Sequence, residues 1–145
     1  MKIYFFILVF FITDLYSKNY DDLYVKAGNY YNVSSRLLKA IAQIESGENV
    51  NALHVNENGT YDVGIMQINS VHFKKLAKYG ITTEEIKKAD YNIFIGAFIL
   101  KQCINKHGIN ENAINCYNGR ISNNPYSKKV ITKYNQISYS YNKLQ

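Results

Sequence analysis

The stretch Leu37-Leu38-Lys39-Ala40-Ile41-Ala42-Gln43-Ile44-Glu45-Ser46-Gly47 decides the fold, because it ends an apolar helix pattern with a carboxyl group. On a helix, Leu38, Ile41 and Ala42 share a face with Glu45, so this acid should meet the edge of the core. Burial disfavours the ionised form and raises a carboxyl pKa toward neutrality. Glu45 is therefore a candidate general acid, and the alternative is a solvated, structural glutamate at a helix end.

The first 17 residues differ from the rest of the 145-residue chain. Lys2 precedes an unbroken apolar stretch from Ile3 to Ile12, and the polar Thr13 and Asp14 follow it. This pattern predicts a signal peptide over residues 1–17 and export to the periplasm. The alternative is an uncleaved N-terminal anchor in the inner membrane. Residues 18–145 contain no linker or repeat and are expected to form one domain.

The chain carries a net charge of +6. Removal of residues 1–17 deletes one lysine and one aspartate, so the charge is unchanged. A basic exported protein favours a polyanionic partner such as a cell-wall polymer or an anionic membrane surface. Nucleic acid is not expected as a partner. The alternative is that the charge serves only solubility.

The only two cysteines are Cys103 and Cys116. In an oxidising compartment such a pair indicates a disulfide, and closing so short a loop would stabilise the fold by roughly 3 kcal/mol. Two free buried thiols are the alternative. Two cysteines make no zinc site alone, and His54, His72 and His107 have no metal spacing, so neither a metal nor a cofactor is expected.

The remaining pattern predicts an α+β chain that is mostly α. Helices are expected over residues 20–31, 35–46, 70–78, 82–89, 90–106, 112–117 and 126–137. Their expected caps are Ser34, Gly47, Ser70, Thr82 with Glu85, and Asp90, and Gly96 should allow close packing. Asn58-Gly59 indicates a hairpin turn, and Val63, Ile65 and Ile68 approximate the period of one short strand that returns to the core.

Four segments occur in a telling order: Glu45-Ser46-Gly47, Tyr61-Asp62-Val63-Gly64-Ile65-Met66-Gln67-Ile68-Asn69, Cys116-Tyr117-Asn118-Gly119, and Tyr126-Ser127-Lys128-Lys129-Val130. In this order the chain resembles the catalytic domain of soluble-type lytic transglycosylases over about residues 19–137. It resembles most closely the small peptidoglycan-cleaving enzymes that accompany type III and type IV secretion systems and pili. The resemblance implies a lysozyme-like fold with a small β-hairpin after the catalytic helix.

The resemblance also implies a mechanism. Glu45 matches the single acid/base that cleaves between N-acetylmuramic acid and N-acetylglucosamine. The C6 hydroxyl of the muramic acid then attacks its own anomeric carbon and gives a 1,6-anhydro ring. Because the nucleophile belongs to the substrate, no second carboxylate is required.

The substrate-binding residues that the resemblance implies come from all four segments: Ser46, Gly64, Met66, Gln67, Asn69, Tyr117, Asn118 and Tyr126. Gln67 offers amide donors and an acceptor to sugars, and the phenol of Tyr117 is expected to position the acid. Met66 has core filling as its alternative, and Ser46 has a role at the end of its helix.

Asp62 allows a second mechanism, because it lies 17 positions after Glu45, the same spacing that separates the two catalytic carboxylates of lysozyme. It could stabilise an oxocarbenium-like state or act as the nucleophile of a muramidase. The alternative is that Asp62 only bonds the hairpin backbone.

Two features depart from the family pattern. The usual Ala-Tyr-Asn-Ala-Gly is replaced by Cys116-Tyr117-Asn118-Gly119-Arg120, and the chain has no tryptophan, so sugar stacking must rely on its tyrosines and phenylalanines. The expected partners are glycan strands of peptidoglycan and components of a secretion system or pilus, with the chain itself a monomer. The rival interpretations are a muramidase, a non-catalytic wall-binding assembly factor and a phage-derived lysis protein.

Overall fold

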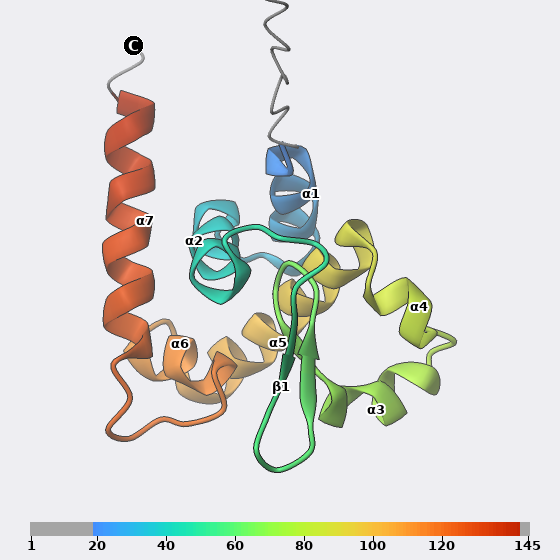
Figure 1. The fold of residues 1–145 in the computed structure, drawn as a ribbon. Coiled ribbons are helices and arrows are strands. Elements are labelled where there is room, and N and C mark those ends of the chain that lie inside the picture. Colours follow the sequence, from blue (N-terminus) through green and yellow to red (C-terminus); the bar gives the residue numbers. More distant parts are fainter. Residues whose placement is uncertain (1–18, 143–145) are drawn as a thin grey trace, which may run out of the picture.

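Long helices surround a small sheet in the computed structural model, which describes residues 19–142 (Figure 1). The elements are α1 (Asp21–Tyr31), α2 (Ser35–Ser46), β1 (Leu53–Val55), β2 (Tyr61–Val63), β3 (Ile68–Asn69), the 3-10 helix η1 (Ser70–His72), α3 (Phe73–Ala77), α4 (Thr83–Ile86), α5 (Ala89–His107), α6 (Glu111–Tyr117) and α7 (Tyr126–Asn142). This arrangement confirms the predicted mostly helical chain with a small sheet after the Glu45 helix. The predicted signal peptide lies outside the described residues.

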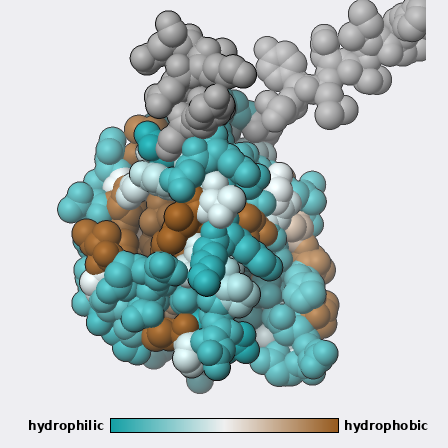
Figure 2. Space-filling view, turned by 90° about the vertical axis from the view of Figure 1, so that its left-hand side faces the viewer, coloured by the Kyte–Doolittle hydropathy of each residue, from teal (hydrophilic) through white to brown (hydrophobic). Residues whose placement is uncertain are grey.

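The core lies between α1, α2, α5 and α7, and it extends to the sheet where α5 contacts β3. Fully buried side chains come from each of these elements, among them Tyr24, Leu38, Ile41, Ile68, Ile93, Leu100 and Val130. The face that carries α7 is mainly hydrophilic, with apolar side chains in separate small groups (Figure 2). Among the helices of the described residues, none is long and apolar enough to cross a membrane.

The ends of α2 lie where the sequence predicts them. The Ser34 hydroxyl accepts a hydrogen bond from the Leu37 amide at 3.2 Å, and Gly47 ends the helix with φ 63°, a left-handed conformation that suits glycine. The capping box of Thr82 and Glu85 is also present. Glu45 therefore stands in the last turn of a well-defined helix.

Two predicted caps are wrong. Asp90 lies inside the first turn of α5, whose N-cap is Lys88 without a side-chain bond. The cap before η1 is Asn69, whose side chain accepts from the Val71 amide. The hydroxyl of Ser70 instead accepts from the Tyr61 amide at 3.1 Å, because it lies beside β2.

The sheet has the antiparallel order β1-β2-β3. β1 and β2 form the hairpin predicted around Asn58-Gly59, with His54 opposite Asp62. The single strand predicted through Val63, Ile65 and Ile68 is wrong, because β2 ends at Val63 and β3 begins at Ile68. A tight turn separates them, in which Gly64 and Gln67 have φ of 79° and 50°. The three apolar side chains are nevertheless all buried.

The disulfide prediction is confirmed, since Cys103 and Cys116 are bonded with their Cα atoms 5.7 Å apart. The bond joins α5 to α6. It fixes one wall of the cleft described next.

Candidate active site

A cleft of about 1520 Å³ lies between the hairpin on one side and α5 and α6 on the other. The sequence-predicted residues that line it are Glu45, Asp62, Gln67, Asn69, Tyr117 and Asn118. These residues are contributed by α2, the sheet with its tight turn, and the end of α6. The fold thus gathers polar side chains that are far apart in the sequence into one hollow.

Glu45 is half-buried in this cleft. Burial raises its pKa from 4.5 to about 7, and the negative charge of Asp62 adds to the rise. The hydroxyl of Tyr126 donates a hydrogen bond to Glu45 Oε1 at 2.5 Å, which opposes the rise. Near neutral pH both forms of this group, the protonated carboxylic acid and the ionised carboxylate, are therefore populated.

Asp62 is held by two side-chain amides. Its carboxylate oxygens accept from Asn56 Nδ2 at 2.9 Å and from Asn69 Nδ2 at 2.7 Å. Side chains rather than the hairpin backbone thus orient Asp62. The contribution of Asn69 to the site is made through its hydrogen bond to Asp62. In the described part of the chain no group of three histidine, cysteine or acidic side chains is placed to hold a metal ion.

Gln67 lines the cleft with half of its amide already used. Its Nε2 donates to the backbone carbonyls of Gly64 at 2.9 Å and Ala52 at 3.3 Å. These bonds close the tight turn and hold it to the start of the hairpin. What Gln67 can offer a ligand is its carbonyl oxygen, an acceptor, rather than the donors expected from the sequence.

Tyr117 and Met66 differ from the expectation. The Tyr117 hydroxyl donates to the Met66 carbonyl at 2.8 Å, so the phenol on the acid is that of Tyr126. The Met66 side chain has no exposed surface. It packs against Gly96, where an added Cβ would lie 2.7 Å from Met66 Cε. The Met66 side chain therefore fills core and does not reach a substrate, which corrects the cleft role implied by the resemblance.

Ser46 and Gly64 lie behind the cleft rather than in its lining. The Ser46 hydroxyl donates to the Ile65 carbonyl at 2.8 Å and accepts from the Asn49 amide at 3.0 Å. It thereby ties the end of α2 to the tight turn. The contribution of these two residues is to shape the backbone around Glu45.

Asn92 is a site-shaping residue that the sequence analysis missed. It is fully buried on α5. Its Oδ1 accepts from the Met66 amide at 2.7 Å, and its Nδ2 donates to the carbonyls of Val63 and Ile86 at 3.0 and 2.7 Å. A single amide within the apolar face of α5 was the signal, since buried polar groups are bonded.

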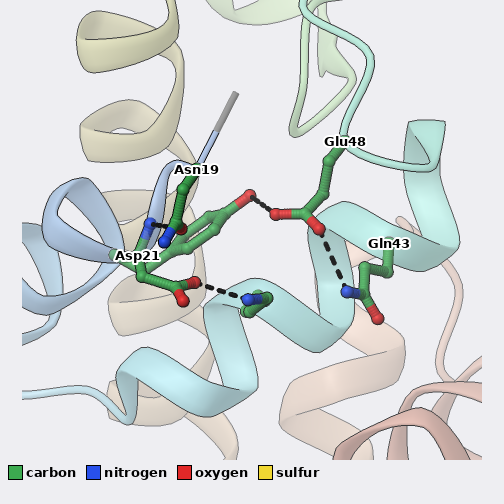
Figure 3. A network of polar contacts seen from close by, with 6 residues as sticks. Asn19, Asp21, Gln43 and Glu48 are labelled. Atoms are coloured by element: carbon green, nitrogen blue, oxygen red, sulfur yellow. Dashed lines mark hydrogen bonds and ion pairs between the residues drawn. The ribbon is translucent and has the colours of Figure 1, made fainter. Parts of the chain in front are cut away.

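The acid helix is also anchored at its back by Glu48, which Figure 3 shows between α1 and α2. Glu48 has φ 64°. Its carboxylate accepts from the Tyr24 hydroxyl and from Gln43 Nε2, both at 3.0 Å. An ion pair from Lys39 to Asp21 joins the same two helices. These contacts fix the chain directly after Glu45.

Asn118 and Tyr126 complete the predicted set. Asn118 lines the cleft and its Oδ1 accepts from Asn124 Nδ2 at 3.1 Å, so its amide nitrogen is oriented by the loop after α6. Tyr126 begins α7 and is 6% exposed. Its contribution is thus made through Glu45.

Known proteins match almost the whole chain. The transglycosylase SLT domain family matches residues 22–142. Protein IpgF of Shigella flexneri is 39% identical over 140 residues, which cover 96% of this chain and 89% of that protein. Invasion protein IagB of Salmonella typhi is 33% identical over 141 residues, with 92% and 88% covered.

A solved structure supports the fold. An inactive mutant of the lytic transglycosylase Slt from Pseudomonas aeruginosa aligns with a TM-score of 0.68 at 20% identity. The alignment covers 88% of this chain and 26% of that one. The predicted lysozyme-like fold is thereby confirmed. From α1 to the end of α7, this chain belongs to the transglycosylase SLT domain family of lytic transglycosylases.

Proposed function

We propose that this lytic transglycosylase cleaves the β-1,4 bond between N-acetylmuramic acid and N-acetylglucosamine in peptidoglycan and leaves a 1,6-anhydro end. Glu45 gives its proton to the glycosidic oxygen as the bond from that oxygen to the muramic acid C1 breaks. The C6 hydroxyl of the same sugar then bonds to C1, and its proton passes to the Glu45 carboxylate. Glu45 is regenerated and no water is consumed.

The observation that carries this proposal is the setting of Glu45, which is half-buried in the cleft and bonded by the Tyr126 hydroxyl, and whose pKa burial raises to about 7. One carboxyl that must first give and then take a proton works best when both forms are accessible near neutral pH. Asp62 stays an acceptor bonded through both oxygens, and its charge faces the cleft where positive charge develops on the sugar.

Product analysis tests the proposal. Purified protein is incubated with peptidoglycan in water labelled with heavy oxygen, and the released muropeptides are analysed by mass spectrometry. Anhydro ends without label are expected. Glu45→Gln should lower the rate by about 10²- to 10⁴-fold. Glu57→Gln is the matched control, because Glu57 is an exposed carboxyl that lines the same cleft.

A muramidase is the second candidate, and it is favoured by the position of Asp62 in the same cleft as Glu45. Its products would carry heavy oxygen at the new reducing end, because water attacks C1. Labelled products would overturn the anhydro mechanism while keeping Glu45 as the acid.

We further propose that the protein acts after export, in the periplasm, where it opens the wall locally for a secretion system or pilus. The support is the predicted signal peptide, the charge of +6 and the likeness to a protein named for invasion. A strain carrying Glu45→Gln should fail to assemble the apparatus. Normal assembly with this variant would instead favour a non-catalytic, wall-binding factor.

A further inference from the structure

An aromatic strip runs from the cleft onto the outer surface of α1 and α5. Its members are Tyr30 and Tyr31 of α1 with Phe94 and Phe98 of α5. The ring centres lie 4.8 Å apart for Tyr30 and Tyr31, 6.0 Å for Tyr30 and Phe94, and 5.8 Å for Tyr31 and Phe98. Each ring therefore contacts the next, and the strip is continuous.

The strip is open to solvent at one end and to the cleft at the other. Tyr30 is 74% exposed, whereas Phe98 lines the cleft that contains Glu45. Core packing accounts for Tyr31 and Phe94, which are half-buried against the core, but it does not require a tyrosine as exposed as Tyr30. A molecule that fills the cleft and extends past Phe98 meets the strip next.

We propose that the aromatic strip extends the substrate cleft and binds the glycan strand of peptidoglycan beyond the sugars held at Glu45. The inference rests on the proposed function. Flat aromatic rings, two of which carry a phenol hydroxyl, suit a ligand that has apolar C–H faces and hydroxyl edges, as sugars do. The chain has no tryptophan, so a stacking platform must be built from tyrosine and phenylalanine rings, and the strip places four of them in a row.

Charge favours the same occupant. Lys75 lines the cleft, and its ammonium lies 5.6 Å from the centre of the Phe98 ring. A cation at the junction of cleft and strip attracts the carboxylates of the peptide stems that glycan strands carry. An apolar protein partner or a bare lipid tail would gain nothing from this lysine.

The test measures binding without cleavage. Glu45→Gln protein is sedimented with intact peptidoglycan sacculi, and the Kd is compared after a second substitution in the strip. Tyr30→Ala should raise the Kd about two- to tenfold, the range of one lost aromatic contact. Tyr30→Phe keeps the ring and should restore binding. Tyr30→Glu should weaken binding further by repelling the stems.

The matched control is Tyr79→Ala, because Tyr79 is 71% exposed and lies outside both the cleft lining and the strip. Equal Kd values for Tyr30→Ala and Tyr79→Ala would overturn the strip. A second readout uses protein that keeps Glu45 and is therefore active. It is the ratio of kcat/KM for long strands to kcat/KM for short fragments, which Tyr30→Ala should lower and Tyr79→Ala should leave unchanged.

The two proposals fail separately. If the protein releases no muropeptides but Tyr30→Ala still weakens binding to sacculi, the proposed catalysis is wrong and the strip stands. If the protein cleaves peptidoglycan and Tyr30→Ala matches the Tyr79→Ala control in both readouts, the strip is wrong and the catalysis stands.

Discussion

At the scale of single residues, the bond from Tyr126 to Glu45 makes a prediction about pH. Tyr126→Phe removes a hydrogen bond that stabilises the charged carboxylate and lowers the pKa of Glu45. In the variant this pKa should rise, so the alkaline limb of the profile of kcat/KM against pH should move to higher pH. The maximal rate should fall roughly ten- to hundredfold, because the carboxyl loses its orienting donor. An alkaline limb that stays in place would show that Tyr126 does not act on the acid.

Asp62 acts on the same carboxyl in the opposite direction. Its negative charge raises the pKa of Glu45. Asp62→Asn should lower that pKa and move the alkaline limb to lower pH, as measured by kcat/KM over a pH series. Glu57→Gln serves as the control, since Glu57 is not among the groups that shift the pKa of Glu45. The hypothesis fails if both variants give the profile of the unaltered enzyme.

Glu45 also makes the stability of the protein depend on pH. Its folded-state pKa of about 7 exceeds the ordinary 4.5. Between these two pH values the folded protein therefore binds more protons than the unfolded chain, and it loses stability as pH rises through them. Glu45→Gln removes this loss. Urea denaturation should show the variant gaining up to about 3 kcal/mol over the unaltered protein above pH 7, and no such gain below about pH 4. If the difference in unfolding free energy between the variant and the unaltered protein does not change with pH, burial of the Glu45 charge is excluded as its cause.

The sequence could predict the setting of Glu45 but not its partner. The apolar face of Leu38, Ile41 and Ala42 is a local pattern, and the structure buries all three. Tyr126 lies 81 positions away from Glu45, and no periodicity within one helix reports such a contact. The resemblance to the family instead assigned the phenol on the acid to Tyr117, whose hydroxyl bonds the Met66 carbonyl.

At the scale of elements, the caps of α2 and α4 were predictable because the interactions are local, whereas the tight turn was not. Its apolar residues Val63, Ile65 and Ile68 imitate the alternation of a strand. Two features break that strand: Gly64 has φ 79°, and the buried amide of Asn92 on α5 bonds the turn. The second feature comes from a distant helix and has no trace in the local pattern.

The turn makes a prediction that separates backbone conformation from crowding. An added Cβ at Gly64 would lie 2.4 Å from Asn92 Nδ2, whereas at Gly59, with a similar φ of 78°, it would meet nothing within 4 Å. Gly59→Ala should cost about 1 kcal/mol of unfolding free energy from conformation alone. Gly64→Ala should cost at least about 2 kcal/mol more, because a bonded amide must move. Equal midpoints in urea denaturation would contradict this account.

At the scale of the whole molecule, the disulfide between Cys103 and Cys116 joins two helices that form one wall of the cleft. Replacing both cysteines by alanine should lower the free energy of unfolding by about 3 kcal/mol, since the unfolded chain regains the freedom of a short loop. Denaturation with and without a reducing agent measures the effect. The reducing agent should change the unaltered protein and leave the double variant as it is.

The Tyr117 hydroxyl donates a hydrogen bond to the Met66 carbonyl and thereby links the wall formed by α6 to the tight turn between β2 and β3. Widening the cleft would break this hydrogen bond and leave the Met66 carbonyl without a donor, so the bond opposes opening of the cleft. The cleft is thus a preformed binding site that does not close on its ligand. Binding of a glycan strand should then occur in a single kinetic phase whose rate rises linearly with strand concentration, without a slow closing step.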